Sequence, residues 1–158
     1  ESDKEGDLPE LIRKQSLHAE IDYMLERLHE YNQNGMQWNQ MAIICRSVEI
    51  GQMIESSQED TDIPLDLMLH EDVLYHPQSN AVKVLSLEQA KGLEFEVVVM
   101  PGLGHIGKQQ NTYIEDLQLL YMGMTRASQH LIMSYHRHTP FVARIKNLTA
   151  ANRVSLSA

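Results

Sequence analysis

The glycine-rich segment at residues 102–108 is the first part of the sequence whose residue types could do chemistry. It reads Gly-Leu-Gly-His-Ile-Gly-Lys, which fits GxGxxG and the first seven positions of GxxxxGK[ST]. In such loops the backbone amides and the lysine cradle nucleotide phosphates. Gln109 stands where a Ser or Thr hydroxyl would hold Mg²⁺, and no strong helical pattern begins there. The segment therefore does not predict a working phosphate-binding loop.

Histidines and the cysteine are the residues that could bind a metal ion. The sequence contains eight histidines, but their spacings match no common zinc pattern, and Cys45 is the only cysteine. We therefore predict no metal site. A single cysteine cannot form an internal disulfide. Because Cys45 lies inside an apolar run, we expect a buried and unreactive thiol.

Length and composition indicate one soluble domain. The chain has 158 residues, of which 42% are hydrophobic and 22% charged, as in ordinary globular proteins. No apolar stretch approaches the roughly 20 residues that cross a bilayer, so no membrane partner is predicted. The N-terminus is acidic where a secretory signal would be basic and then apolar. We therefore expect a cytoplasmic protein.

The formal net charge of −9 argues at first against a nucleic-acid partner, but the charge is unevenly distributed. Residues 1–80 carry 17 acidic and 5 basic side chains, whereas residues 81–158 carry 5 acidic and 8 basic ones. The second half is therefore where a polyanion would bind. Charges that merely solvate two different surfaces would give the same asymmetry.

The first half of the chain predicts a helix followed by a strand and a second helix. Apolar residues recur at helical spacing from 17 to 28, and Asn34-Gly35 supplies a stop signal. The apolar run 41–45 is typical of a strand that is buried on both faces. A helical pattern through Ile50 and Ile54 follows it, then an acidic loop at 55–62 and a further short strand at 63–69.

The second half predicts three more strands and one helix. The strands are expected at 81–85, 96–100 and 130–135, and the helix at 114–125. Strands that alternate with helices predict an α/β fold whose sheet is mostly parallel, with ligands at the carboxyl ends of the strands. Residues 1–12 are expected to be disordered, residues 13–146 to form the domain, and residues 147–158 to form a tail.

Three segments resemble motifs of one family, in the family's order. Met41–Ser47 is similar to motif IV of the UvrD/Rep-type superfamily 1 DNA helicases, a hydrophobic strand that ends in an arginine. Ser86–Phe95, with the following Glu96–Val99, resembles motif V, and Leu119–Ala127 resembles motif VI. The resemblance covers roughly residues 17 to 145 and indicates the C-terminal RecA-like (2A-type) domain of such an enzyme.

The resemblance implies a fold and a division of labour. The fold is a RecA-like (P-loop NTPase-like) three-layer sandwich with a mostly parallel sheet and no phosphate-binding loop of its own. ATP with Mg²⁺ is then held mainly by an N-terminal RecA-like domain of the same parent chain. This domain faces the nucleotide from across a cleft, and the 158-residue chain on its own is expected to be inactive.

The resemblance also assigns nucleotide-binding roles to four residues. Arg126 matches the motif VI arginine finger, whose planar guanidinium stabilises charge on the γ-phosphate and is worth about 10³–10⁵ in rate. Arg46 matches the motif IV arginine, which also reaches the γ-phosphate. Glu94 matches the acid of motif V that contacts the ribose, and Gly92 belongs to the same nucleotide-binding segment.

Contacts to single-stranded DNA are implied at the start of motif V. Ser86 stands at the position of a threonine that touches the strand, and its hydroxyl can donate to a phosphate. Glu88 replaces a histidine and would repel a phosphate, whereas the charge of Lys91 could compensate.

Two functions of different classes follow from these observations. The first is the C-terminal motor domain of an ATP-dependent DNA helicase or translocase, which supplies the arginine finger and part of the single-stranded DNA track. The second is a catalytically idle helicase-like module that docks another protein, as the acidic first half and Glu88 would allow. Arg46, Glu94 and Arg126 together favour the first function, because a docking module needs none of them.

Overall fold

The structure is a computed structural model that describes residues 9–69, 78–90, 92–105, 117 and 127–157. Its longer helices are α1 (Leu17–Gln33), α2 (Val48–Ser56) and α4 (Pro140–Ser157), and short 3₁₀ turns form η2 (Trp38–Gln40), η3 (Ser57–Asp60) and η4 (Leu103–His105). The strands are β1 (Glu10–Arg13), β2 (Met41–Cys45), β3 (Leu65–Leu67), β4 (Val82–Ser86), β5 (Phe95–Met100) and β6 (Ala127–Tyr135).

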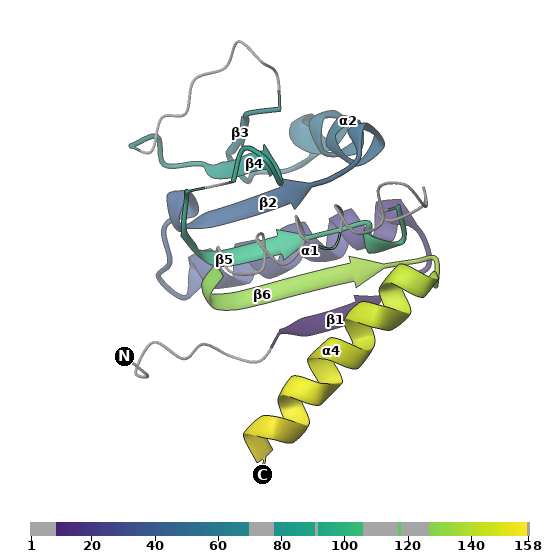
Figure 1. Cartoon of the computed structure of the whole chain (residues 1–158). Coiled ribbons are helices and arrows are strands. Elements are labelled where there is room, and N and C mark those ends of the chain that lie inside the picture. The colour runs from purple at the N-terminus through teal and green to yellow at the C-terminus, as the bar shows by residue number, and fades with distance from the viewer. Residues whose placement is uncertain (1–8, 70–77, 91, 106–116, 118–126, 158) are drawn as a thin grey trace.

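The six strands form one sheet in the order β1-β6-β5-β2-β4-β3, and every described pair of neighbours is parallel. All carboxyl ends therefore lie at the same edge, which is the edge to which the arrowheads point in Figure 1. The predicted α/β fold with a mostly parallel sheet is confirmed, and within the described residues the sheet is wholly parallel.

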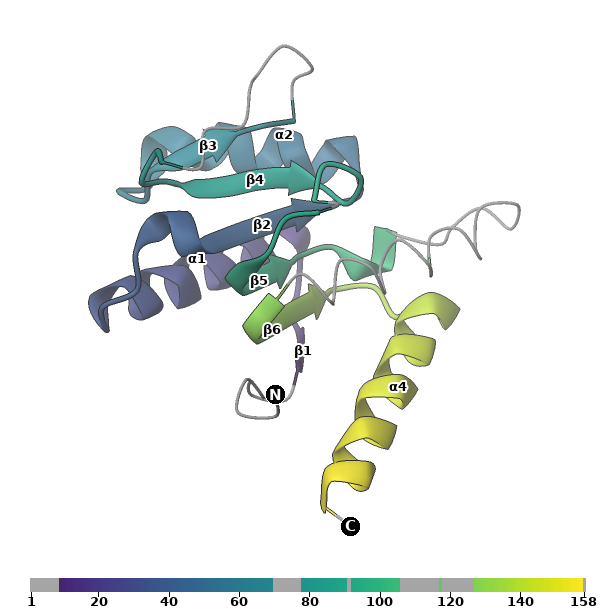
Figure 2. The ribbon, with the colours of Figure 1, turned by 60° about the vertical axis from the view of Figure 1, so that its left-hand side comes forward.

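Apolar side chains on both faces of the sheet create two cores. Along β2, Met41, Ile43 and Cys45 point into the core beneath α1 and α2, while Ala42 and Ile44 point into the opposite core. The opposite core also receives apolar residues from the first turns of α4. Figures 1 and 2 show α1 and α2 on one side of the sheet and α4 on the other. This two-sided burial explains why β2 is an unbroken apolar run rather than an alternating one.

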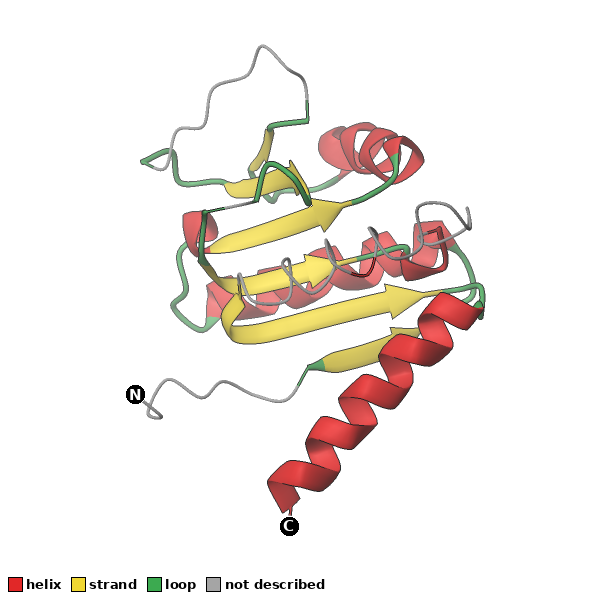
Figure 3. Ribbon diagram, in the orientation of Figure 1, coloured by secondary structure: helices red, strands yellow, loops and turns green. Residues whose placement is uncertain are grey.

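The helix boundaries follow local capping signals. The Ser16 side chain accepts a hydrogen bond from the Ala19 amide and begins α1, and Ser47 does the same for the Glu49 amide at the start of α2. The end of α1 falls at Asn34, next to Gly35, whose φ of 108° suits glycine. The predicted positions of both helices are confirmed. In Figure 3 both helices are red and run beside the yellow strands.

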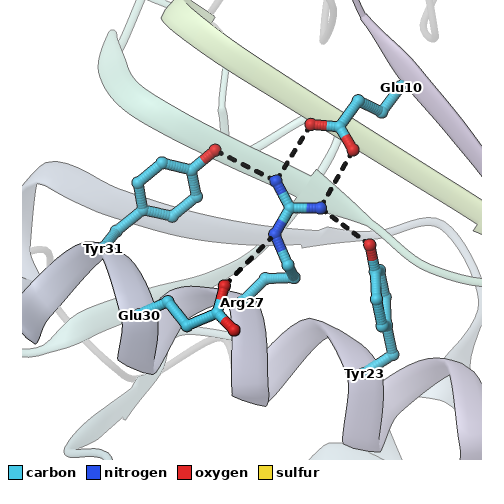
Figure 4. Close-up of polar contacts among 5 residues, drawn as sticks. All are labelled: Glu10, Tyr23, Arg27, Glu30 and Tyr31. Atoms are coloured by element: carbon cyan, nitrogen blue, oxygen red, sulfur yellow. Dashed lines mark hydrogen bonds and ion pairs between the residues drawn. The ribbon is translucent and has the colours of Figure 1, made fainter.

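An arginine cluster attaches β1 to α1. Arg27, on α1, donates two hydrogen bonds of 2.9 Å to the Glu10 carboxylate on β1, and it also donates to the hydroxyls of Tyr23 and Tyr31 (Figure 4). Glu30 lies 3.8 Å from the same guanidinium. The hydrogen bonds to Glu10 and the two tyrosines raise the pKa of Arg27 above its usual value. The cluster therefore holds the edge strand β1 against the helix that follows it.

A buried lysine joins the two strands at the other edge of the sheet. Lys83, on β4, is fully buried, and its ammonium donates to the Asp66 carboxylate on β3 at 2.7 Å and to the Ser79 carbonyl at 3.0 Å. A buried ammonium needs such partners because its desolvation is costly. The short β3 is thus attached through a side chain as well as through its backbone.

The expected termini need correction. Residues 10–12 belong to β1 and pair with β6, so the expected disordered segment 1–12 is wrong at its end; residues 1–8 lie outside the described residues. Helix α4 runs through the expected domain boundary between residues 146 and 147. Of the helix expected at 114–125, only Leu117 is described. None of the helices in the described part of the chain is both long and apolar enough to cross a membrane.

Candidate functional site

Two of the predicted site residues line one pocket. Arg46 and Ser86 follow or end neighbouring strands, β2 and β4, whose register pairs Cys45 with Ser86. Between them lies a pocket of about 340 Å³ at the carboxyl edge of the sheet. Its lining comprises Cys45, Arg46, Ser47, Val48, Gly51, Gln52, Glu55, Leu69 and Ser86. The position agrees with the expectation that ligands bind at the carboxyl ends of parallel strands.

Arg46 is positioned by the junction of β2 and α2. The strand is wholly buried up to Cys45, and Ser47 begins the helix one residue after Arg46. The Ser47 hydroxyl accepts a hydrogen bond of 3.0 Å from the Glu49 amide, which fixes the turn. The half-buried Arg46 is therefore held between a rigid strand and a capped helix, where its guanidinium can serve a ligand in the pocket.

Ser86 is held in a reciprocal pair of hydrogen bonds with Gln89. The Ser86 hydroxyl accepts from the Gln89 amide at 3.0 Å, and the Gln89 side chain accepts from the Ser86 amide at 2.9 Å. The Gln89 side chain also donates to the Met68 carbonyl. Because the Ser86 oxygen acts as an acceptor in this turn, its own hydrogen stays free to donate. The neighbouring Glu88 is exposed.

Gly92 and Glu94 lie toward the opposite edge of the sheet, because the segment after Ser86 crosses back to the start of β5. Gly92 has a φ of 80°, and Glu94 is exposed immediately before Phe95. Ile43 pairs with Val99, so about eight residue steps separate the levels of Arg46 and Glu94, or roughly 25 Å along the strands. The structure does not bring these two side chains together.

The remaining predicted residues lie outside the described part of the chain. They are Lys91, in motif V, and Arg126, in motif VI. Ala127, the residue after Arg126 in the sequence, begins β6 and pairs with Phe95, the residue after Glu94. Motifs V and VI thus both lead into the start of the neighbouring strands β5 and β6.

The first amide of the glycine-rich segment at 102–108 is hydrogen-bonded to a carboxylate from another part of the chain. The Gly102 amide donates to the Glu20 side chain at 2.7 Å, and Leu103–His105 form the 3₁₀ turn η4. A carboxylate at this amide would repel a phosphate there. Residues 106–108 lie outside the described residues. The described part therefore supports the prediction that this segment is no phosphate-binding loop.

A buried carboxylate and a basic pocket escaped the sequence reasoning. Glu20 is fully buried and accepts hydrogen bonds from Gly102, Ser134 and His136. His136 also lines a second pocket together with Arg13 and Lys14. No local pattern marks Arg13, Lys14 or His136, since the parallel pairing of β1 with β6 brings distant parts of the chain together. Only the amphipathic pattern of α1 gave a signal, because Glu20 interrupts its apolar face.

Cys45 is buried as predicted, with 2% of its surface exposed. Burial raises the pKa of its thiol to about 12, because the thiolate would lack solvation. It lines the pocket of Arg46 but does not act as a nucleophile there at neutral pH. Among the residues that the structure describes, no three His, Cys, Asp or Glu side chains gather as metal ligands would.

Comparisons with known proteins find similarity to helicases. Residues 67–138 match the UvrD-like helicase C-terminal domain. A probable DNA helicase of Mycoplasma pneumoniae is 29% identical over 122 residues, which cover 72% of this chain and 20% of that protein. An ATP-dependent helicase/nuclease subunit from Lactobacillus gasseri is 23% identical over 157 residues, which cover 75% of this chain and 12% of that protein.

The fold is also shared with a solved structure. The C-terminal domain of a possible DNA helicase from Lactobacillus plantarum superposes with a TM-score of 0.69 at 23% identity, covering 91% of this chain and 84% of that one. The chain spans a fifth or less of the length of the two helicase relatives. The comparisons therefore show similarity to UvrD-like helicase C-terminal domains over residues 67–138 and a shared fold over most of the chain.

Proposed function

We propose that this chain is the C-terminal motor domain of an ATP-dependent DNA helicase or translocase. In this proposal it completes a site whose ATP and Mg²⁺ are held mainly by an N-terminal RecA-like domain of the same parent protein. Arg126 acts as the arginine finger, Arg46 senses the γ-phosphate, and Gly92 and Glu94 contact the nucleotide. Ser86 and Lys91 contact single-stranded DNA.

The observation that carries the proposal is the shared pocket of Arg46 and Ser86. Both side chains are able to donate hydrogen bonds to an anion, one as a guanidinium and the other as a hydroxyl, and they lie at the ends of adjacent strands of a rigid sheet. A domain that responds to a phosphate at Arg46 can therefore transmit the change to Ser86 through a single pair of strands. Such coupling is what a motor needs to connect nucleotide state with its grip on a nucleic acid.

The separation between Arg46 and Glu94 limits how one nucleotide can contact both side chains. Roughly 25 Å is too far for one small group to touch both side chains. The proposal therefore requires either that ATP lies along the domain between them or that closure against the partner domain moves the segment that carries Gly92 and Glu94. Gly92, with its φ of 80° and open space where a Cβ would stand, gives that segment a site of backbone freedom.

The test is the DNA-stimulated ATPase activity of the parent protein. Arg126→Ala should lower turnover by about 10³-fold or more, because an arginine finger is worth that much in phosphoryl transfer. Arg46→Ala should also lower turnover. Arg144→Ala is the matched control, since Arg144 is exposed on α4 and lines neither described pocket. Unchanged turnover in Arg126→Ala would refute the assignment of the finger.

A second measurement distinguishes an effect on DNA binding from an effect on the nucleotide site. Ser86→Ala in the parent should raise the DNA concentration that half-saturates the ATPase while leaving turnover at saturating DNA nearly unchanged. The Ala variant keeps the Ser86 amide that donates to Gln89, so the turn retains half of its reciprocal pair. A fall in turnover without a change in DNA dependence would place Ser86 in the nucleotide site instead.

A further inference from the structure

An open basic pocket lies at the carboxyl ends of β1 and β6. It has a volume of about 650 Å³ and is lined by Arg13, Lys14, Gln15, Ala19 and His136. None of these five residues is acidic. Arg13 is exposed, and neither Arg13 nor Lys14 forms an ion pair with any residue in the described part of the chain. In a protein with a net charge of −9, two adjacent cations that have no carboxylate partner among the described residues form an unusual surface.

The pocket is built on rigid elements. Arg13 pairs with Tyr135 across the two strands, and the Lys14 amide donates to the Tyr135 carbonyl at 2.9 Å. The Lys14 ammonium lies 4.2 Å from the centre of the Tyr23 ring, a cation–π contact that leaves its hydrogen-bond donors available. The Arg27–Glu10 pair holds the same strand at its other end. The Arg13 backbone and the Lys14 ammonium are therefore held in place by contacts that leave both positive charges unneutralised.

His136, which forms part of the pocket wall, is held in place by contacts with two buried side chains. The His136 ring faces the Glu20 carboxylate at 2.6 Å through Nδ1, and it packs against the His105 ring with ring centres 5.3 Å apart and planes tilted by 51°. Glu20 is fully buried and is already satisfied by Gly102 and Ser134. Its charge is thus matched by three donors beneath the pocket, and Arg13 and Lys14 determine the sign of the charge that a ligand meets.

We infer that this pocket binds a backbone phosphate of single-stranded nucleic acid through Arg13 and Lys14. The inference rests on the proposed motor function and extends its strand contacts beyond Ser86. Both sites stand at the carboxyl edge of one parallel sheet, because Arg13 ends β1 and Ser86 ends β4. The Ala19 amide at the start of α1 is not available to a phosphate, because it already donates a hydrogen bond to the Ser16 hydroxyl.

The spacing of the two sites suits a strand that runs along the sheet edge. Four strand intervals separate β1 from β4, or about 19 Å at the usual 4.8 Å per interval. That distance corresponds to about six nucleotides at a rise of 3.4 Å, and to fewer when the strand is stretched. An open pocket also suits a chain that passes through it, whereas a small free anion is better held by an enclosed site.

The experiment uses two pairs of variants of the 158-residue chain. The first pair compares Arg13→Gln/Lys14→Gln with Arg144→Gln/Lys146→Gln, which removes the same two charges from exposed positions on α4 that do not line the pocket. The second pair compares Ala19→Glu with Ala19→Gln, which differ only in charge. Position 19 is the third of α1 after the cap Ser16, where Glu and Gln both favour the helix, so both variants should fold.

Binding of a labelled oligothymidylate is measured by fluorescence anisotropy as a function of salt concentration. The Arg13/Lys14 variant should bind about tenfold more weakly at low salt, and its salt slope should be smaller by about 0.7 to 1.4, as expected for one or two lost phosphate contacts. Ala19→Glu should weaken binding and Ala19→Gln should not. The Arg144/Lys146 variant should keep the slope of the unmodified chain.

Competition with inorganic phosphate and with ATP distinguishes the sources of the phosphate group. Displacement of the oligonucleotide at comparable concentrations of either small anion would identify a small-anion site and overturn the inference. Equal slopes for the two double variants, or no binding by the unmodified chain, would overturn it as well. None of these results would affect the ATPase test with Arg46 and Arg126, so the two proposals fail separately.

Discussion

The Glu20 carboxylate and the His136 ring meet at 2.6 Å, although the two residues are 116 positions apart in the sequence. Glu20 belongs to α1, and His136 directly follows β6. The same carboxylate receives the Gly102 amide just after β5 and the Ser134 hydroxyl on β6. One buried side chain thus joins the helix to the ends of β5 and β6, the two neighbouring strands into which motifs V and VI lead.

The first prediction concerns this junction. Glu20→Gln should lower the free energy of unfolding by about 2–4 kcal/mol. The side-chain NH₂ of Gln would face groups that are themselves donors, and the negative charge to which these groups donate would be lost. Urea unfolding followed by circular dichroism measures the change as a shift in midpoint at constant slope. Glu26→Gln, exposed on the same helix, is the control. Equal midpoints for the two variants would show that the hydrogen bonds to Glu20 contribute little.

The second prediction concerns the attachment of β1. Glu10→Gln should destabilise the chain by about 1 kcal/mol, a modest value because the Glu10 side chain is 34% exposed. Glu30→Gln should have a smaller effect, since its contact with Arg27 is 3.8 Å long and its side chain is 60% exposed. Amide hydrogen exchange of β1 checks the mechanism: Glu10→Gln should speed exchange in residues 11–13 more than Glu30→Gln does.

The third prediction compares two glycines. Gly102 has a φ of 77°, and a Cβ there would also meet Ile50 Cδ1, so Gly102→Ala should cost about 2–4 kcal/mol from backbone strain and overpacking. Gly35 has a φ of 108° with no atom within 4 Å of a Cβ, so Gly35→Ala should cost about 1 kcal/mol. Thermal unfolding of both variants gives the order. A larger cost at Gly35 would contradict the close approach of Ile50.

The fourth prediction is a pH dependence that arises from Cys45. Its thiol titrates near pH 9.0 in the unfolded chain and near 12 in the fold, so between these values the unfolded state has lost a proton that the folded state retains. Stability due to this group is therefore present below pH 9.0 and falls by about 1.4 kcal/mol per pH unit above it.

The measurement for Cys45 is the difference in stability between the unmodified chain and Cys45→Ala. Cys45→Ala removes the titration, so the difference should shrink as pH rises through this window, whereas other groups titrate equally in both proteins. A constant difference would show that the thiol ionises as readily in the fold as in the unfolded chain. Alkylation of Cys45 at neutral pH should likewise require denaturant.

Much of the fold could be predicted because its signals are local. The unbroken apolar runs Met41–Cys45 in β2 and Val97–Met100 in β5 are long enough to identify strands buried on both faces, and Ser16 and Ser47 mark helix starts in the sequence itself. The strand β1 was overlooked because its four residues, Glu-Leu-Ile-Arg, have too little apolar character. Its place is determined by pairing with β6 and by the Arg27–Glu10 contact, which are interactions with distant parts of the chain.

The candidate site also has features that the sequence predicts and features that only the tertiary structure reveals. Motifs IV and V identified Arg46 and Ser86 from the sequence, and the register of β2 with β4 placed them in one pocket. The roles of Arg46, Ser86, Lys91, Gly92, Glu94 and Arg126 remain predictions. The distance between Arg46 and Glu94 could not have been foreseen from their motifs, because it depends on the direction in which the chain crosses from β4 to β5.

The sequence by itself determined the strands other than β1, the two amphipathic helices, the buried Cys45 and the order of the three motifs, because each depends on residues that are neighbours along the chain. The tertiary structure alone decided the junction at Glu20 and the pocket of Arg13, Lys14 and His136. The physical reason is that a parallel sheet brings the carboxyl ends of all its strands to one edge, so residues from both ends of the chain meet there.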